Sequence, residues 1–369
     1  MSKLGLYIHI PFCKSKCPYC SFVSFQGRDE SLDPYLLALQ KEALYFKGRE
    51  VSSVYIGGGT PTILDKKRLE FLFSIINVNF SLSPDAEVTI EANPATFDLA
   101  KAESLRDYGV NRVSLGIQSF NNKFLGFLKR PYDRTQALEA VDILKQANFK
   151  NINLDLMYGL PGQDTKEIEE DVKTLLSLSC PHASVYTLSI EAGSEFYKNN
   201  LRLLSCDHQA SCYELVKNML VEAGFCHYEV SNFALNNFEC RHNLNYWRGG
   251  TYLGLGVAAH SYIDGRRFWN TDRLDVYMNL LRQGFPAHAG EEHLDPSGQL
   301  MESFLIGLRL TEGVDLKNLE ATHQVKLPEE KERQISEFIR GGFLENEDSR
   351  FRTTAKGMMI LDELCSRLI

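Results

Sequence analysis

Short apolar runs alternate with longer amphipathic segments over roughly the first 225 residues, and this alternation limits the fold most strongly. The strand-like runs occupy 4–10, 54–56, 87–91, 112–117, 152–157 and 183–188. Between them, apolar residues recur at spacings of three and four, as in helices, at 33–46, 66–76, 99–108, 135–148 and 165–178. Because each crossover places its helix on the same face of the sheet, six such units predict an α/β fold with an incomplete (βα)6 barrel.

The rest of the chain departs from this alternation. A helix is expected at 208–222, short strands and turns at 228–270, and helices at 274–282 and 298–308. From residue 314 the pattern predicts two helices, a small hairpin at 343–351 and a last helix, an order typical of winged-helix domains. We therefore expect a barrel core at 1–235, a connecting segment at 236–300 and a mainly helical, winged-helix-like domain at 301–369.

Composition narrows the class of protein. The chain has 369 residues, of which 44% are hydrophobic, enough for a large core, and no apolar stretch approaches the roughly 18 residues of a membrane span. A net charge of -8 argues against a general nucleic-acid binder, because phosphate neutralisation needs a basic surface. With no recognisable leader, the cytoplasm is the expected location. Small molecules or proteins are the expected partners, and peripheral membrane contact and oligomeric state stay open.

Cys13, Cys17 and Cys20 directly follow the first apolar run. Three thiolates at this spacing predict a 4Fe-4S cluster, in which one iron keeps a position that no protein ligand occupies. Structural zinc needs four ligands, and Phe22 stands at the next candidate position. A disulfide framework fits poorly with nine irregularly spaced cysteines and a reducing compartment. Three core cysteines brought together by chance remain the third alternative.

Three glycines, at 57–59, follow the second apolar run and precede Thr60. Glycine lets a backbone pass close to a ligand, with amide groups free to pair with a carboxylate or amine. A tight turn explains such a run equally well when it stands alone. Beside a cluster with an open iron, the ligand-binding interpretation is favoured.

Polar side chains lie at or just beyond the ends of the later apolar runs. They include an acid, Glu91, an amide, Gln118, and a second acid, Asp155, and a cation, Arg130, lies further along the chain. Together they offer partners for ribose hydroxyls, a carboxylate and an ammonium group. Each also has a structural alternative, as a helix cap, a surface ion pair or a satisfied buried polar group. Because strand ends converge in this fold class, one shared site is predicted.

In combination these motifs resemble the radical S-adenosylmethionine proteins of the oxygen-independent coproporphyrinogen oxidase type. The resemblance covers nearly the whole chain and is carried by YIHIPFC at 7–13 with Cys17 and Cys20, GGGTPT at 57–62, GIQSF at 116–120 and DLMYGLP at 155–161. It implies that the open iron chelates S-adenosylmethionine, and that reduction cleaves it to a 5'-deoxyadenosyl radical. It also implies a set of nucleotide-binding residues, namely Tyr7, Gly58, Gly59, Thr60, Glu91, Gln118, Arg130 and Asp155.

Two features separate the branches of that family. The true oxidase carries an N-terminal extension and a further cysteine two residues after the third ligand, whereas here six residues precede Tyr7 and Phe22 replaces that cysteine. The segment HNLNYW at 242–247 is instead similar to the HNxxYW motif of the haem-chaperone branch. That similarity implies His242 as an axial haem ligand, with Tyr246 and Trp247 covering the macrocycle. A loop histidine packed on aromatic residues is the alternative.

Two functions follow as hypotheses. The first is a protein that binds a 4Fe-4S cluster, S-adenosylmethionine and haem, and delivers haem to recipient haemoproteins. The second is an enzyme that decarboxylates coproporphyrinogen III to protoporphyrinogen IX by an oxidative radical reaction. Phe22 and the short N-terminal segment favour the first, for which oxidase activity is expected to be absent.

Overall fold

Six parallel strands form the centre of a twelve-stranded sheet in a computed structural model, which describes residues 4–368. In spatial order they are β1 (Leu4–Ile10), β4 (Arg49–Gly58), β5 (Phe80–Ala92), β6 (Arg112–Gln118), β7 (Asn151–Tyr158) and β8 (His182–Thr187). Every neighbouring pair among them is parallel. The predicted incomplete (βα)6 barrel is therefore confirmed, with the strands at the predicted places.

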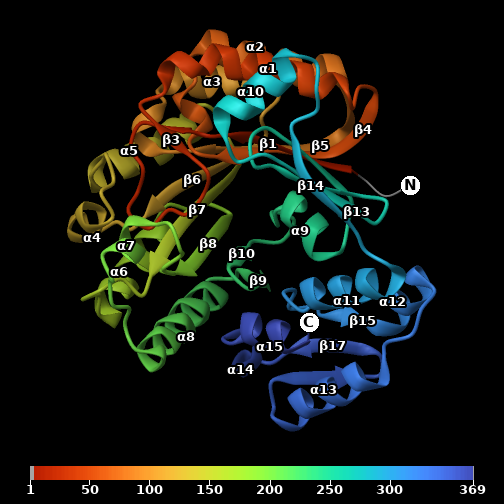
Figure 1. Cartoon of the computed structure of the whole chain (residues 1–369). Helices are drawn as coiled ribbons and strands as arrows, with labels where there is room; N and C mark the ends of the chain where they lie inside the picture. Colours follow the sequence, from red (N-terminus) through yellow and green to blue (C-terminus); the bar gives the residue numbers. More distant parts are fainter. Residues whose placement is uncertain (1–3, 369) are drawn as a thin grey trace.

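Helices cover the outer face of this curved sheet (Figure 1). The crossover helices are α1 (Leu32–Leu44), α2 (Lys66–Asn79), α3 (Leu99–Asp107), α5 (Arg134–Gln146) and α6 (Thr165–Ser177), followed by α8 (Cys206–Glu222). An aspartate caps the start of each of four of them by accepting a hydrogen bond from a first-turn amide: Asp65, Asp98, Asp133 and Asp164. Such caps stabilise a helix by about 1 kcal/mol each, and they fix where these helices begin.

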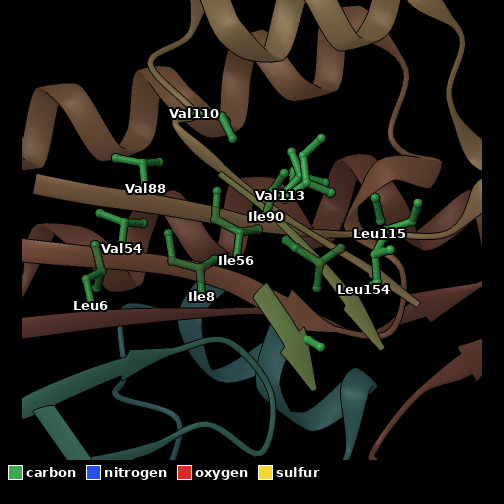
Figure 2. Close-up of a cluster of buried hydrophobic side chains, with 14 of the residues drawn as sticks. Leu6, Ile8, Val54, Ile56, Val88, Ile90, Val110, Val113, Leu115 and Leu154 are labelled. Atoms are coloured by element: carbon green, nitrogen blue, oxygen red, sulfur yellow. The ribbon is translucent and has the colours of Figure 1, made fainter. Parts of the chain in front are cut away.

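Alternation along the strands divides the sheet into two chemically different faces. Figure 2 shows the apolar face, where side chains such as Leu6, Ile8 and Val54 are fully buried against the helices. Successive side chains point to opposite faces, so the residues between them point into the barrel. Those inward residues include Glu91 and Asp155, and they surround a cavity. The barrel interior is polar and hollow, and the hydrophobic core lies outside it.

The sheet continues beyond the barrel at both edges. On the β1 side, β11 (Tyr252–Leu255) pairs in parallel, and β12 (His260–Ile263), β13 (Arg266–Asn270) and β14 (His288–His293) follow as an antiparallel meander. On the β8 side lie β10 (Asn232–Ala234) and β9 (Cys226–Glu229). A short helix, α9 (Arg241–Trp247), interrupts the region for which only strands and turns were predicted, and α10 (Leu274–Arg282) occupies its predicted range. The proposed divisions at residues 235 and 300 stay predictions.

A second, smaller unit follows the extended sheet. It contains α11 (Pro296–Gly307), β15 (Val314–Asp315), α12 (Leu316–His323), α13 (Glu329–Arg340), β16 (Leu344–Glu347), β17 (Arg350–Thr353), α14 (Ala355–Met358) and α15 (Leu361–Leu368). Its three strands form a separate antiparallel sheet in the order β15-β17-β16. The predicted helical domain with a hairpin is confirmed. Over residues 4–368, no helix is both long and apolar enough to span a bilayer.

Candidate functional site

The three predicted cluster cysteines lie on one loop whose two ends are held together. At its base, β2 (Phe12–Cys13) pairs in parallel with β3 (Phe25–Gln26). Within the loop the Cys20 amide donates to the Cys17 carbonyl at 3.1 Å. All three thiols are free, and all three line one cavity of about 470 Å³ at the mouth of the barrel. Cys13, Cys17 and Cys20 thus share one cavity, and their role as cluster ligands stays a prediction.

The three thiols do not converge on one point. Within residues 4–368, no three His, Cys, Asp or Glu side chains are placed to hold one metal ion together, and the cluster stays a prediction. A cubane carries its irons at separate corners, so its thiolates need not converge on one point. Thr60 Oγ1 lies 3.8 Å from Cys13 Sγ, and Arg130 Nη1 donates to Cys17 Sγ at 3.1 Å. Burial raises the pKa of the Cys13 thiol, and the Thr60 hydroxyl partly opposes this effect.

The glycine run differs from its prediction in one respect. The Gly58 amide donates to Glu91 Oε2, the Gly59 amide to the Ile10 carbonyl and the Thr60 amide to the Phe12 carbonyl, each at 2.9 Å. The prediction that these amides are free for a ligand was wrong, because the strand and Glu91 already use them. Gly58 adopts a φ of 112°, and a Cβ there would lie 2.3 Å from the His9 ring. Position 58 therefore needs glycine, both for its backbone conformation and for its packing on His9. Gly58, Gly59 and Thr60 still line the cavity.

Two acids face the cavity from neighbouring parts of the barrel. Glu91, at the end of β5, accepts hydrogen bonds from the Tyr55 hydroxyl at 3.0 Å and from the Gly58 amide. Burial, with the nearby Asp155 charge as a smaller cause, raises the pKa of Glu91 to about 7. Burial likewise raises the pKa of Asp155 to about 6, although Asn153 donates to it at 2.6 Å. Both acids can change protonation near neutral pH and can attract a cationic ligand when ionised.

Gln118 and Arg130 complete the predicted set on the other side of the cavity. Gln118 has a positive φ of 74° and follows a register shift in the pairing of β6 with β7, so its side chain turns inward. Its Oε1 accepts from the Tyr186 hydroxyl at 2.6 Å. Arg130 Nη2 donates to the Gly116 carbonyl at 2.8 Å, and its Nη1 reaches Cys17. Arg130 thereby connects the barrel wall to the cysteine loop.

Tyr7 lies outside the cavity lining, and its hydroxyl is 2.8 Å from His9 Nδ1. Sequence reasoning missed other residues that do line the cavity: Tyr55, Arg112, Ser114, Asn153, Ser184, Tyr186 and Asn243. Arg112, Ser114 and Asn153 alternate along β6 and β7, the strands that carry Gln118 and Asp155, and Ser184 and Tyr186 alternate along β8. Strand parity is the signal that identifies them, because residues two apart share a face.

His242 lies on α9 beneath the barrel, on a helix and not in the loop that was predicted. It is 1% exposed, with Nδ1 2.9 Å from Ser53 Oγ and Nε2 2.9 Å from the Tyr246 hydroxyl. Its ring stacks on Tyr55 at a centroid distance of 5.3 Å. Burial lowers the pKa of His242 to about 3, so the ring is neutral. Its predicted role as a haem ligand requires that one of these hydrogen bonds breaks and that α9 opens.

The two aromatic residues of the same segment point toward the C-terminal unit. Tyr246 and Trp247 line a separate cavity of about 190 Å³ between α9 and α11. Sites for organic ligands usually measure about 300–1,000 Å³, so this cavity is too small for a macrocycle as it stands. The Arg309 guanidinium lies 4.8 Å from the centroid of the Trp247 ring. The structure therefore places Trp247 in the contact between α9 and the C-terminal unit.

Comparison with known proteins agrees with this architecture. Residues 7–175 match the Radical SAM superfamily, and residues 294–360 match the HemN C-terminal domain. The solved structure of coproporphyrinogen III oxidase (HemN) from Escherichia coli, titled a radical SAM enzyme, superposes with a TM-score of 0.88. That likeness covers 100% of this chain and 90% of the other at 24% identity, and it supports the fold alone.

The fold and the cysteine-lined cavity together define a protein of the radical S-adenosylmethionine class. Two curated relatives are more specific. The chain is 36% identical to "Heme chaperone HemW" of Lactococcus lactis, over 95% of this chain and 93% of that one. It is 34% identical to the protein of the same name from Bacillus subtilis, over 97% of both chains. The chain belongs to the HemW family.

Proposed function

We propose that this protein is a haem chaperone, which binds haem and transfers it to recipient haemoproteins in the cytoplasm. One observation carries the proposal: the chain aligns over nearly its whole length with relatives named heme chaperones. The structure supports it at one position that separates the two hypotheses. Phe22, which replaces the additional cysteine of the oxidase branch, is 68% exposed and lines the cavity mouth. A fourth thiol is therefore missing where the alternative function would place it.

Cys13, Cys17 and Cys20 would hold a 4Fe-4S cluster, because they are free thiols lining one cavity. When bound, such a cluster supplies one electron at an iron that can also coordinate a small ligand. Glu91 and Asp155 would orient a cationic nucleotide such as S-adenosylmethionine by charge and by accepting hydrogen bonds from ribose hydroxyls. Both acids are half-buried in the cavity wall, where the lower local dielectric strengthens these interactions.

Haem would bind where α9 meets the C-terminal unit. Release of His242 from Ser53 and Tyr246 would expose an imidazole for iron, and outward movement of α9 would enlarge the adjoining aromatic cavity. A state that requires opening suits a carrier, because the closed form disfavours haem retention and promotes its release. Haem affinity would then depend on how easily α9 opens.

The test is anaerobic reconstitution followed by haem titration and transfer. The reconstituted protein is titrated with haem, separated from free haem, and mixed with a haem-free recipient protein whose holo form has a distinct Soret spectrum. We expect stoichiometric haem binding and transfer to the recipient, with no protoporphyrinogen IX formed from coproporphyrinogen III under reducing conditions. Formation of that product without haem transfer would replace this proposal with the oxidase function.

A further inference from the structure

Arg112 is a buried cation that forms no direct hydrogen bond or ion pair with any described side chain. It begins β6, and it is 2% exposed although it lines the barrel cavity. Over residues 4–368, its guanidinium makes no hydrogen bond within 3.5 Å and no ion pair within 4.0 Å, and its Nε is among the buried atoms without a partner. Buried charges are normally paired, because burying an unpaired charge costs several kcal/mol. A guanidinium left unpaired beside a cavity indicates a missing anionic partner.

Glu87, whose charge acts on Arg112, does not pair with it directly. Glu87 uses both carboxylate oxygens at the start of α9, where it accepts hydrogen bonds from the amides of Arg241 and His242, each at 3.1 Å. Although burial acts to lower the pKa of Arg112, the nearby Cys240 and Glu87 raise it above its usual value. Arg112 therefore stays protonated at every pH at which the protein is folded.

A second group with spare hydrogen-bonding capacity lies at the same cavity. Asn243, in the first turn of α9, also contributes to the lining. In the described part of the chain its side-chain amide makes no hydrogen bond, unlike the neighbouring His242, which makes two. Cys240 connects the two groups: it lies close to Arg112 and receives a hydrogen bond from the Asn243 backbone. A cationic fork on β6 and an amide on α9 thus line the same cavity.

These groups lie deep in the barrel, away from the cysteine loop. Arg112 precedes Gly116 by four residues on β6, which corresponds to about 13 Å along a strand. Gly116 is where Arg130, the partner of Cys17, contacts the barrel wall. The Arg112 backbone is therefore well separated from the cysteine loop, while its charge still acts on Asp155 inside the same cavity.

We infer that Arg112 and Asn243 form a carboxylate-binding subsite at the floor of the barrel cavity. A planar carboxylate matches the guanidinium with two parallel hydrogen bonds and leaves a lone pair for the Asn243 amide. A single negative charge fits best, since Glu91 and Asp155 line the same cavity and repel a dianion such as phosphate. The inference goes beyond the proposed haem function, because it concerns an anionic ligand inside the barrel and not the haem iron; Asn243 lies on α9, so the subsite belongs to the closed state.

The test compares sodium acetate with sodium chloride at equal ionic strength, using the full-length, cluster-reconstituted protein. Thermal unfolding is followed as acetate concentration increases, and the methyl resonance of acetate is observed for line broadening. We expect a saturable rise in Tm with acetate beyond that with chloride, a smaller rise with phosphate, and broadening of the acetate signal. Repeating the titration with saturating S-adenosylmethionine distinguishes two sources of the carboxylate. The response persists if a separate acid occupies the subsite and is lost if the nucleotide ligand does.

Two variants and one control decide the assignment. Arg112→Gln should remove the acetate-specific rise in Tm, and Asn243→Ala should reduce it at least twofold. Asn243→Ala breaks no side-chain hydrogen bond of the described structure, so it keeps the test valid even if Arg112→Gln does not fold. Arg49→Gln, at an exposed arginine on β4, should respond like the unmodified protein. The subsite is disproved if acetate has no specific effect, or if Asn243→Ala and a folded Arg112→Gln respond as fully as the parent protein.

Discussion

The two ends of the barrel differ in how ready they are for a ligand. At the carboxyl ends of the strands, three free thiols and two acids surround a cavity of about 470 Å³. At the other end, α9 closes the barrel, and both nitrogens of His242 are hydrogen-bonded. The cofactor end is preformed, because a fixed β-sheet positions its residues. The proposed haem end is closed, so the free energy needed to open it lowers the observed affinity for haem.

The two ends are nevertheless in physical contact. The His242 ring stacks on Tyr55, and the Tyr55 hydroxyl donates to Glu91, which faces the cavity at the mouth of the barrel. Opening α9 would remove the ring beneath Tyr55 and loosen one of the two hydrogen bonds that hold Glu91. A ligand that fixes Glu91 in place would, by reciprocity, favour the closed position of α9.

The largest expected effect concerns the cofactor end. Replacing Cys13, Cys17 or Cys20 singly by alanine should abolish most iron and sulfide incorporation, since a cluster with only two protein ligands is poorly held. Iron and sulfide analysis and the visible absorbance of the reconstituted protein measure this loss. Cys206→Ala, at an exposed cysteine on α8, is the matched control and should keep the cluster. Full cluster content in two of the three loop variants would refute the assignment.

The next effect tests the closed end. His242→Ala should keep its cluster absorbance and lose the Soret band of bound haem, because the proposed iron ligand is gone. Ser53→Ala should act in the opposite direction. It removes one hydrogen bond that holds His242 closed, worth about 1 kcal/mol, and should raise the open population and the rate of haem binding about fivefold.

Stopped-flow mixing with haem measures the rate, and titration measures the affinity. His260→Ala, at an exposed histidine on β12, serves as the control and should bind haem normally. Unchanged haem affinity and spectrum in His242→Ala would assign the iron ligand elsewhere. Equal rates in Ser53→Ala and the parent protein would show that the closure of α9 does not limit binding.

An effect of intermediate size concerns how stability and ligand binding depend on pH. It distinguishes Glu91, which faces the cavity, from a buried acid elsewhere in the protein. The pKa of Glu91 is about 7 in the folded protein against an ordinary 4.5, so between these values the native state holds a proton that the unfolded chain has lost. The free energy of unfolding therefore falls as pH rises through this window, by about 3 kcal/mol for this group. Glu91→Gln should remove that part of the decline, as measured by chemical denaturation from pH 4.5 to 7.5.

Glu42 provides a matched control. It is buried between α1 and α10, where Tyr277 donates to it, and burial raises its pKa to about 7 as well. Glu42→Gln should flatten the decline in stability to a similar extent. Only Glu91→Gln should also weaken S-adenosylmethionine binding, and only above about pH 7, where Glu91 carries its charge. Equal S-adenosylmethionine affinity in both variants at pH 8 would remove Glu91 from the proposed nucleotide site.

The sequence was informative where a pattern repeats and uninformative where contacts are distant in sequence. Strand and helix periodicity located the barrel, and α10 occupies its predicted range, because tertiary packing selects the same apolar faces. The seven-residue α9 was missed because it has only about two turns, too few to establish a helical pattern of apolar residues. The cysteine loop and the acids at the strand ends were found because parallel strands bring their carboxyl ends together.

Other features of the site depend on partners that no local pattern encodes. The amides of Gly59 and Thr60 bind carbonyls of the first strand region, about fifty residues earlier, and are thus unavailable to a ligand. The sequence predicts only that Arg112 belongs to a strand. That its charged side chain is buried becomes visible only in the folded barrel. A sequence pattern indicates on which face of the sheet a side chain lies. Whether its polar groups find hydrogen-bond partners can be seen only in the folded structure.

The smallest expected effect concerns Trp247, which either covers haem or packs against the C-terminal unit. In the closed state it lies beneath the Arg309 guanidinium, a contact worth about 0.5–1 kcal/mol. Trp247→Phe and Arg309→Met should each lower the free energy of unfolding by about this amount, and the double variant should cost less than their sum because both changes break one contact. Denaturant titration measures the cycle, and haem titration of the same proteins assigns the role. If Trp247 serves packing alone, haem affinity in Trp247→Phe changes less than twofold. A tenfold loss of haem affinity confined to Trp247→Phe would place this ring over the macrocycle and extend the haem site to the end of α9.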